Sequence, residues 1–133
     1  KKSIAAEKQM DREALKARPL GLELLTEAIS IGAKISYISD TPYSSTEIQG
    51  ILQEAGIPIA GKIFVSSEHR ATKREGDLFD IVRSSMNIKV SDWLHVGDDL
   101  RADVTSPKSR GISVLHTPKQ IEELNQESNL NAF

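Results

Sequence analysis

The stretch that decides the fold runs from Leu94 to Val104 and reads LHVGDDLRADV. Its apolar run ends abruptly at Gly97-Asp98-Asp99, a third aspartate, Asp103, follows four residues later, and a helix-like segment comes next. Carboxylates at the carboxyl end of a buried strand suit Mg²⁺, which prefers oxygen ligands. They also lie where open α/β sheets bind their ligands. Gly and Asp are equally ordinary turn residues, so this stretch alone fits a metal site and a strand-to-turn junction about equally well.

The composition bounds the class of protein. A chain of 133 residues with 38% hydrophobic and 27% charged residues predicts one globular domain. The formal charge of −2 gives no electrostatic reason to expect nucleic acid or an anionic membrane as a partner. No apolar run is long enough for a bilayer span and no signal peptide is visible, so we expect no membrane insertion and a cytoplasmic location. The absence of cysteine excludes disulfides and thiolate chemistry.

Short apolar runs alternate with helical patterns along most of the chain. The runs predict four strands, at residues 34–39, 62–66, 92–97 and 112–115. Helical patterns cover residues 20–31, the segment after a Ser44–Glu47 capping box, residues 77–86 and, interrupted by Pro107, residues 99–109. This alternation predicts an α/β fold, with a parallel sheet covered by helices on both faces.

The ends of the chain have a different character. Residues 5–17 are rich in Ala, Glu, Lys and Gln and predict a weakly amphipathic helix. The start has no convincing helix cap and looks like a cut edge of something longer. Residues 118–124 suggest one short helix before a frayed tail.

Polar residues follow the first three predicted strands, where the carboxyl ends of a parallel sheet share one edge. They supply a hydroxyl, an ammonium and several carboxylates, a combination that suits a bound phosphoryl group and its metal. The residues are Ser39, Asp40, Thr41, Lys73, Asp98, Asp99 and Asp103.

Each of these residues also has an ordinary structural explanation. Ser39 is of a type common in turns and caps, and a lysine in a polar loop such as that of Lys73 is commonly solvated. Asp103 is compatible with a helix cap. His95 lies in an apolar strand and is interpreted as a core or edge histidine. The other two histidines are isolated from any metal-like spacing.

The order of these elements resembles that of the haloacid dehalogenase (HAD) superfamily, from about residue 20 to residue 116. A serine ends a strand, a loop lysine follows, and Gly97 to Asp103 match Gly-Asp-x-x-x-x-Asp. The local sequence is most similar to that of HAD-like domains of bacterial surface and capsular polysaccharide biosynthesis proteins. The segments that carry this similarity are ISD at 38–40, VSSE at 65–68, KREGDLF at 73–79 and WLHVGD at 93–98.

The resemblance implies roles for the phosphate-binding residues. Ser39, with Asp40 and Thr41 beside it, would bind the transferring phosphoryl group, and Lys73 would stabilise that group and the nucleophile. The substrate would be a phosphorylated small molecule, with a sugar phosphate among the candidates.

The resemblance also implies a Mg²⁺ site. Asp98 would be the metal ligand and Asp99 an accessory carboxylate, while Asp103 would either support the metal site or hold Lys73.

One motif of the superfamily is missing. Its first motif, Asp-x-Asp on the first, central strand, supplies the nucleophile and the general acid/base, and no Asp-x-Asp occurs here. The aspartates are residues 11, 40, 77, 80, 92, 98, 99 and 103. We therefore expect a HAD-like Rossmannoid sheet whose first central strand is absent, and whose unpaired neighbours are completed by the rest of a longer polypeptide or a second copy.

This expectation divides the chain into a remnant of a helical cap (1–18), a partial HAD-like core (19–117) and a carboxyl-terminal helix and tail (118–133). Two functions remain open. The first is the carboxyl-terminal portion of a Mg²⁺-dependent phosphohydrolase that is inactive alone. The second is a non-catalytic module that binds a phosphate or sugar phosphate, or acts as a scaffold, within a capsular polysaccharide biosynthesis protein. A phospho-accepting receiver domain fits less well. Its acidic pair follows the first strand, whereas the acidic cluster of this chain comes late in the sequence.

Overall fold

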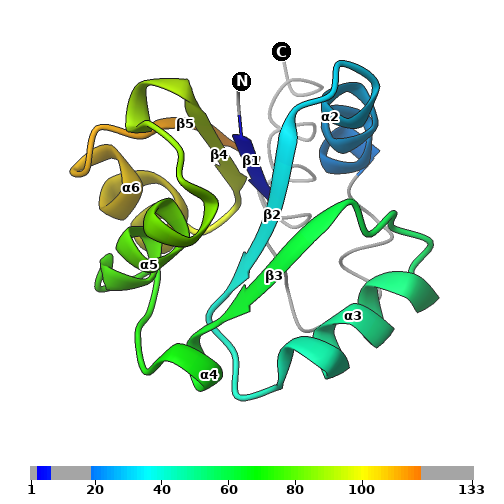
Figure 1. Cartoon of the computed structure of the whole chain (residues 1–133), viewed down its shortest axis with the longest axis horizontal. Coiled ribbons are helices and arrows are strands. Elements are labelled where there is room, and N and C mark those ends of the chain that lie inside the picture. Colours follow the sequence, from blue (N-terminus) through cyan, green and yellow to red (C-terminus); the bar gives the residue numbers. More distant parts are fainter. Residues whose placement is uncertain (1–2, 7–18, 118–133) are drawn as a thin grey trace, which may run out of the picture.

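A computed structural model describes residues 3–6 and 19–117 of the chain (Figure 1). These residues form a five-stranded sheet in the order β3-β2-β1-β4-β5, in which every pair of neighbours is parallel. The strands are β1 (Ser3–Ala6), β2 (Lys34–Ser39), β3 (Gly61–Val65), β4 (Trp93–Gly97) and β5 (Ser113–His116). The predicted parallel α/β architecture is confirmed.

The helices connect these strands and follow the predicted pattern closely. The capping box predicted from Ser44 and Glu47 forms at the start of α3. The helical elements are α2 (Pro19–Ser30), α3 (Ser45–Glu54), α4 (Ser66–His69), α5 (Asp77–Met86), the 3₁₀-helix η1 (Val90–Asp92), the π-helix η2 (Leu100–Thr105) and α6 (Ser106–Lys108).

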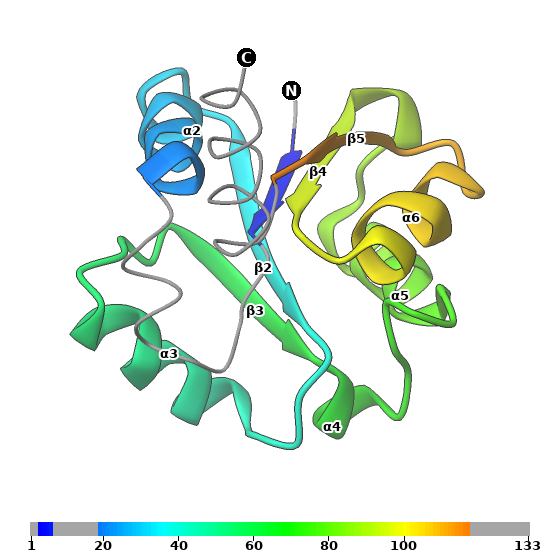
Figure 2. The ribbon, with the colours of Figure 1, turned by 180° about the vertical axis from the view of Figure 1, so that it is seen from behind.

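Two hydrophobic cores lie on opposite faces of the sheet, because successive side chains of a strand point to opposite faces. Along β2, Ile35 and Tyr37 join a core built with α2 and α3, whereas Ile38 joins a core built with α5. Both views of the ribbon show α2 and α3 on one side of the sheet and α5 with α6 on the other (Figures 1 and 2). Helices thus cover both faces, as predicted.

The amino-terminal strand corrects one prediction. β1 lies at the centre of the sheet, pairing with β2 from Ser3 opposite Lys34 and with β4 from Ser3 opposite Trp93. The expectation that the first central strand is absent is therefore wrong, and residues 3–6 are strand rather than cap remnant. Alanine favours helices in isolation, but here two flanking strands supply partners for the backbone groups of β1 and override that preference. The remainder of the expected cap, and the predicted carboxyl-terminal helix and tail, lie outside the described residues.

The central strand also removes the reason to invoke a second copy or another polypeptide at this position, because the chain itself pairs with β2 and β4. Two smaller differences concern helices. The predicted helix at 99–109 divides into η2 and α6, with Pro107 inside the short α6. The segment after β3, predicted as loop, begins with the short helix α4.

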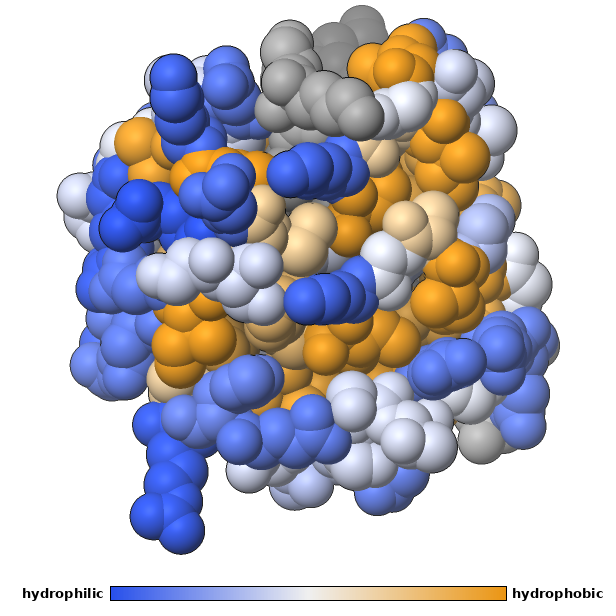
Figure 3. All heavy atoms as spheres, in the orientation of Figure 1, coloured by the Kyte–Doolittle hydropathy of each residue, from blue (hydrophilic) through white to orange (hydrophobic). Residues whose placement is uncertain are grey.

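The surface mixes charged and apolar residues. Figure 3 shows hydrophilic side chains gathered over the side where α5 and α6 lie and apolar ones in the middle of the same face. Among the described helices, none has the length and apolar character needed to cross a membrane.

Candidate functional site

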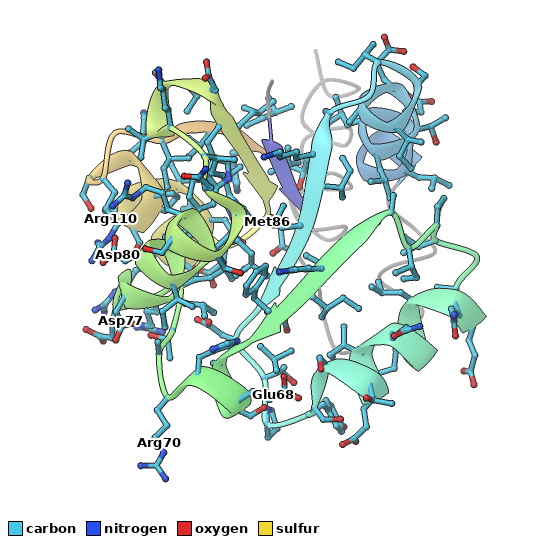
Figure 4. All side chains as sticks on the ribbon, in the orientation of Figure 1. Glu68, Arg70, Asp77, Asp80, Met86 and Arg110 are labelled. Carbon is cyan, nitrogen blue, oxygen red and sulfur yellow. The ribbon has the colours of Figure 1, made fainter. Side chains whose placement is uncertain are left out.

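The lysine loop, residues 72–76, lies at the carboxyl ends of the strands and is fixed at both of its ends. Thr72 donates its backbone N–H to Asp77 Oδ1 at 2.9 Å, and Glu75 donates its own to Thr72 Oγ1 at 2.9 Å. Gly76 precedes α5 with a φ of 97°, a conformation that favours glycine. On the outer surface of α5, Arg110 lies beside Asp80, with 3.1 Å between Nε and Oδ1 (Figure 4).

Lys73 is buried within this loop, with 1% of its side chain exposed. Its Nζ lies 2.6 Å from Oδ1 of Asp103, whose side chain is 0% exposed. The main chain of Lys73 is also held, because its N–H donates to Asp40 Oδ1 at 2.7 Å and its carbonyl oxygen accepts from Ser106 Oγ at 2.5 Å. Lys73 is therefore a fixed, internal cation rather than the solvated loop lysine that the sequence also allowed.

The carboxylate of Asp103 accepts from three donors. Oδ1 receives Lys73 Nζ and also lies 2.8 Å from His95 Nε2, while Oδ2 receives the N–H of Asp99 at 3.0 Å. Burial alone would raise the pKa of Asp103, but the charge of Lys73, together with the hydrogen bonds from His95 and Lys73 and the charge of His95, holds that pKa well below its usual range. Asp103 is thus an ionised internal carboxylate that holds Lys73.

The turn after β4 requires its glycine. A Cβ on Gly97 would lie 2.3 Å from Cγ of Asp103, so only glycine allows this carboxylate to approach the strand end. The next residue, Asp98, is 2% exposed, and its carbonyl oxygen lies 3.0 Å from His116 Nε2. Asp98 therefore provides one buried carboxylate at the end of β4. Gly97 leaves the space that a second one, that of Asp103, occupies.

Asp99 has a local task. Its Oδ1 accepts from the N–H groups of Arg101 and Ala102, at 3.0 and 2.8 Å, and caps the start of η2. This bonding orders the turn that carries Asp98 and Asp103, and it leaves Asp99 in a supporting position.

The end of β2 contributes a buried hydroxyl. Ser39 is 1% exposed, and its Oγ has no hydrogen-bond partner among the residues that the structure describes. A buried hydroxyl of this kind is costly unless it is satisfied, and a bound ligand is one way to satisfy it.

The other two residues expected to bind phosphate have different bonding. Both carboxylate oxygens of Asp40 accept backbone N–H groups, from Lys73 and, at 3.2 Å, from Arg74. The N–H of Thr41 donates to Ser66 Oγ at 2.8 Å. Asp40 and Thr41 therefore support the loop architecture around Lys73.

Comparisons with known proteins concern the fold. No protein-family model and no curated protein matches the sequence. Among solved structures, the core domain of a candidate phosphoglycolate phosphatase from Streptococcus pneumoniae is 14% identical, with a TM-score of 0.65 over 97% of this chain and 96% of that one. A HAD phosphatase from Thermococcus onnurineus is 19% identical, with a TM-score of 0.62 over 82% of this chain and 53% of that one. The chain has the HAD-like fold.

A third structure, an uncharacterized protein from Corynebacterium glutamicum, is 17% identical, with a TM-score of 0.62 over 97% of this chain and 93% of that one. At these identities the likeness concerns the backbone arrangement. Within the HAD-like fold, the polar residues named above meet at the carboxyl edge of the sheet, where such folds bind ligands.

The fit of Mg²⁺ to this edge of the sheet is partial. Within residues 3–6 and 19–117, no group of three or more His, Cys, Asp or Glu side chains is arranged to hold a metal ion. Asp103 bonds Lys73 and His95, and Asp99 caps η2, while Asp98 is a buried carboxylate directly after β4. Mg²⁺ often uses one or two carboxylates together with water and substrate phosphate, so a site with a single carboxylate ligand is compatible with Mg²⁺.

Two features of the site are not found by sequence reasoning. His95, interpreted as a core or edge histidine, bonds Asp103 directly. A usable signal exists, because a buried histidine needs a hydrogen-bond partner and carboxylates follow it closely in the sequence.

The second missed feature is a set of ties between α4 and the loop after β2. Three successive residues, 66 to 68, bond alternate positions after β2, namely residues 41, 43 and 45. Ser66 Oγ donates to Thr41 O at 3.1 Å and Ser67 Oγ to Tyr43 O at 2.6 Å. Glu68 accepts from Ser45 N at 2.8 Å, and Figure 4 shows it at α4. These ties fix the two loops that flank Ser39 and Lys73.

Proposed function

We propose that this chain is the phosphoryl-binding portion of a Mg²⁺-dependent HAD-type phosphohydrolase. Ser39 would donate its hydroxyl to a phosphate oxygen, and Lys73 would neutralise phosphate charge. The single observation that carries this proposal is the burial of Lys73, whose ammonium is 1% exposed and bonded to an internal carboxylate.

A buried ion pair gains little stability over apolar residues of similar size, so its presence calls for another reason. Lys73 and Asp103 bond one another at the carboxyl edge of the sheet. The buried hydroxyl of Ser39 ends β2 at the same edge, one residue before Asp40, which accepts the N–H of Lys73. An internal cation and a hydroxyl at one edge suit an anionic ligand, and phosphate is an anion that matches both donors. A phosphorylated small molecule, including a sugar phosphate, is the proposed ligand class.

Asp98 is the proposed Mg²⁺ ligand, with Asp99 and Asp103 ordering the turn around it. The metal would supply charge neutralisation for the bound phosphate. With one carboxylate from the described residues, we expect Mg²⁺ to bind weakly unless a phosphate is present.

A second candidate function follows from the sequence. Without Asp-x-Asp the chain lacks the superfamily's nucleophile, so covalent phosphoryl transfer by an aspartate is not expected from this chain alone. The alternative is a non-catalytic module, in a capsular polysaccharide biosynthesis protein, that binds a phosphate or sugar phosphate or acts as a scaffold. A cytoplasmic location stays a prediction from the sequence.

The test measures binding and turnover separately on the whole chain. Orthophosphate binding is followed by calorimetry with and without Mg²⁺, in the unmodified chain and in Ser39→Ala, with exposed Ser113→Ala as the matched control. We expect binding that Mg²⁺ strengthens and that Ser39→Ala weakens by about tenfold, the loss of one hydrogen bond to a charged group. No binding, or equal binding in all three proteins, would contradict the proposal.

Turnover is measured with p-nitrophenyl phosphate and Mg²⁺. We expect none from this chain. Robust turnover that is lost in Asp98→Ala would show instead that the chain is catalytically complete.

A further inference from the structure

His95 is a histidine that bonds the Asp103 carboxylate directly. It belongs to β4, is 0% exposed, and places Nε2 2.8 Å from Asp103 Oδ1. The same oxygen receives Lys73 Nζ at 2.6 Å. The imidazole ring also meets the ring of Phe79 edge to face, with centroids 5.0 Å apart and planes at 84°. Packing and hydrogen bonding therefore both fix the orientation of this ring.

The protons of the network can be assigned from charge. An ionised carboxylate only accepts hydrogen bonds, so His95 must carry a proton on Nε2 to bond Asp103. Nε2 of His95 is therefore protonated and donates to Asp103 Oδ1.

Because His95 lies in a strand of the sheet, its hydrogen bond can hold the Asp103 carboxylate in a fixed orientation. β4 is flanked by β1 and β5, with His95 opposite Ala5 on one side and Val114 on the other. The N–H of Asp99 fixes the second oxygen of the Asp103 carboxylate from the turn. Two donors from the strand and its turn thus orient the carboxylate, and the carboxylate in turn orients the Lys73 ammonium.

We propose that His95 is a positioning residue, an Nε2–H donor that holds the Asp103 carboxylate and, through it, the Lys73 ammonium at the carboxyl edge of the sheet. The effect on phosphate binding rests on the function proposed above, whereas the protonation of Nε2 and the order of Lys73 do not.

The direct test is nuclear magnetic resonance of the full chain labelled with ¹⁵N in histidine. We expect Nε2 of His95 to be protonated at neutral pH, while exposed His69 serves as the reference ring. A proton on Nδ1 alone would overturn the proposal. This measurement needs no substitution and no ligand.

Two variants then separate positioning from packing. His95→Gln keeps a side-chain N–H that can reach Asp103, whereas His95→Leu keeps apolar volume and removes the donor. We expect the Lys73 ammonium signal of ¹⁵N-lysine-labelled protein to stay sharp in His95→Gln and to broaden in His95→Leu. We also expect His95→Leu to weaken orthophosphate binding by about tenfold, at the low end for residues that orient a functional side chain.

The outcomes are distinguishable. A sharp Lys73 signal in His95→Leu, or equal loss in both variants, would overturn the positioning role. If the unmodified chain binds no phosphate while the protonation of Nε2 and the Lys73 signal behave as expected, the proposed function fails and the positioning role stands. Should His95→Leu not fold, the protonation of Nε2 in the unmodified chain and the His95→Gln variant still decide.

Discussion

The segment after β2 and the segment after β4 both hold Lys73, but they hold different parts of it. Asp40, after β2, is half-buried and accepts two main-chain N–H groups of the lysine loop. Asp103, after β4, is fully buried and accepts the ammonium itself. The first contact fixes the path of the loop, and the second compensates an internal charge. Similar carboxylates therefore carry unequal energetic weight.

The largest effect is expected from the β4 side. Asp103→Asn leaves the buried ammonium of Lys73 without its counter-charge, and we expect the free energy of unfolding to fall by about 3–5 kcal/mol. Urea denaturation measures this, with exposed Asp92→Asn as a control that should change stability by less than about 0.5 kcal/mol. A loss for Asp103→Asn no larger than that of the control would remove the distinction between the two carboxylates.

Acid titration tests the same charge without relying on one variant. Because the pKa of Asp103 is lower in the folded than in the unfolded chain, its stabilising contribution is present above the unfolded value of about 4 and is lost as the pH falls towards the folded value. We expect stability to drop between about pH 4 and pH 2 in the unmodified chain, and to drop less steeply in Asp103→Asn. Identical acid slopes in the two proteins would contradict this assignment.

Gly97→Ala sharpens the β4 side further. The added Cβ would lie 2.3 Å from Asp103 Cγ and push that carboxylate away from Lys73. We expect a loss of about 1–3 kcal/mol, the usual range for overpacking. Gly50→Ala in α3 is the matched control, since a Cβ there meets nothing within 4 Å and should stabilise the helix by about 0.5–1 kcal/mol. If Gly97→Ala leaves the free energy of unfolding unchanged or raises it, as Gly50→Ala should, the contact between Gly97 and Asp103 is not tight.

The β2 side should respond more weakly. Asp40→Asn keeps one acceptor oxygen but turns an amide group towards a backbone N–H, so we expect a loss of about 1–2 kcal/mol in urea denaturation. If Asp40→Asn lowers the free energy of unfolding as much as Asp103→Asn does, the contact of the Lys73 ammonium contributes no more to stability than the contact of its backbone N–H.

The smallest effect is expected at the rim. Glu68 is exposed and bonds Ser45, so Glu68→Gln should cost about 0.5 kcal/mol. The thermal midpoint of Glu68→Gln, compared with that of exposed Glu23→Gln, measures it. A loss as large as that of Asp40→Asn would mean that the hydrogen bonds from α4 contribute as much to stability as those between Asp40 and the lysine loop.

Sequence patterns predicted the elements whose signals are local. The strand at residues 34–39 coincides with β2, and the capping box at Ser44 opens α3, because alternation and capping act over a few residues. β1 was missed because Ser3–Ala6 is strand only through partners distant in sequence, β2 and β4.

The site divides in the same way. The motif order pointed to Ser39, Lys73 and Asp98, and the structure places Ser39 and Asp98 at the carboxyl ends of two parallel strands. The bonding of Asp40 did not follow from the sequence, since only the fold brings it near the lysine loop. The resemblance left two roles open for Asp103, and the fold shows its contact with Lys73. Asp99 differs, because its partners are only two and three residues away. His95 was read as a core or edge histidine because its partner, eight residues later, is adjacent only after η2 has turned back.

The central claim is that Lys73 is an internal, held ammonium rather than a surface lysine. Competitive acylation of the folded chain, read by mass spectrometry lysine by lysine, tests it directly, with exposed Lys62 and Lys89 as internal references. We expect Lys73 to react far more slowly than both references in the native chain and at the same rate as both in urea. Equal reaction of Lys73 and the two references in the native chain would contradict the account.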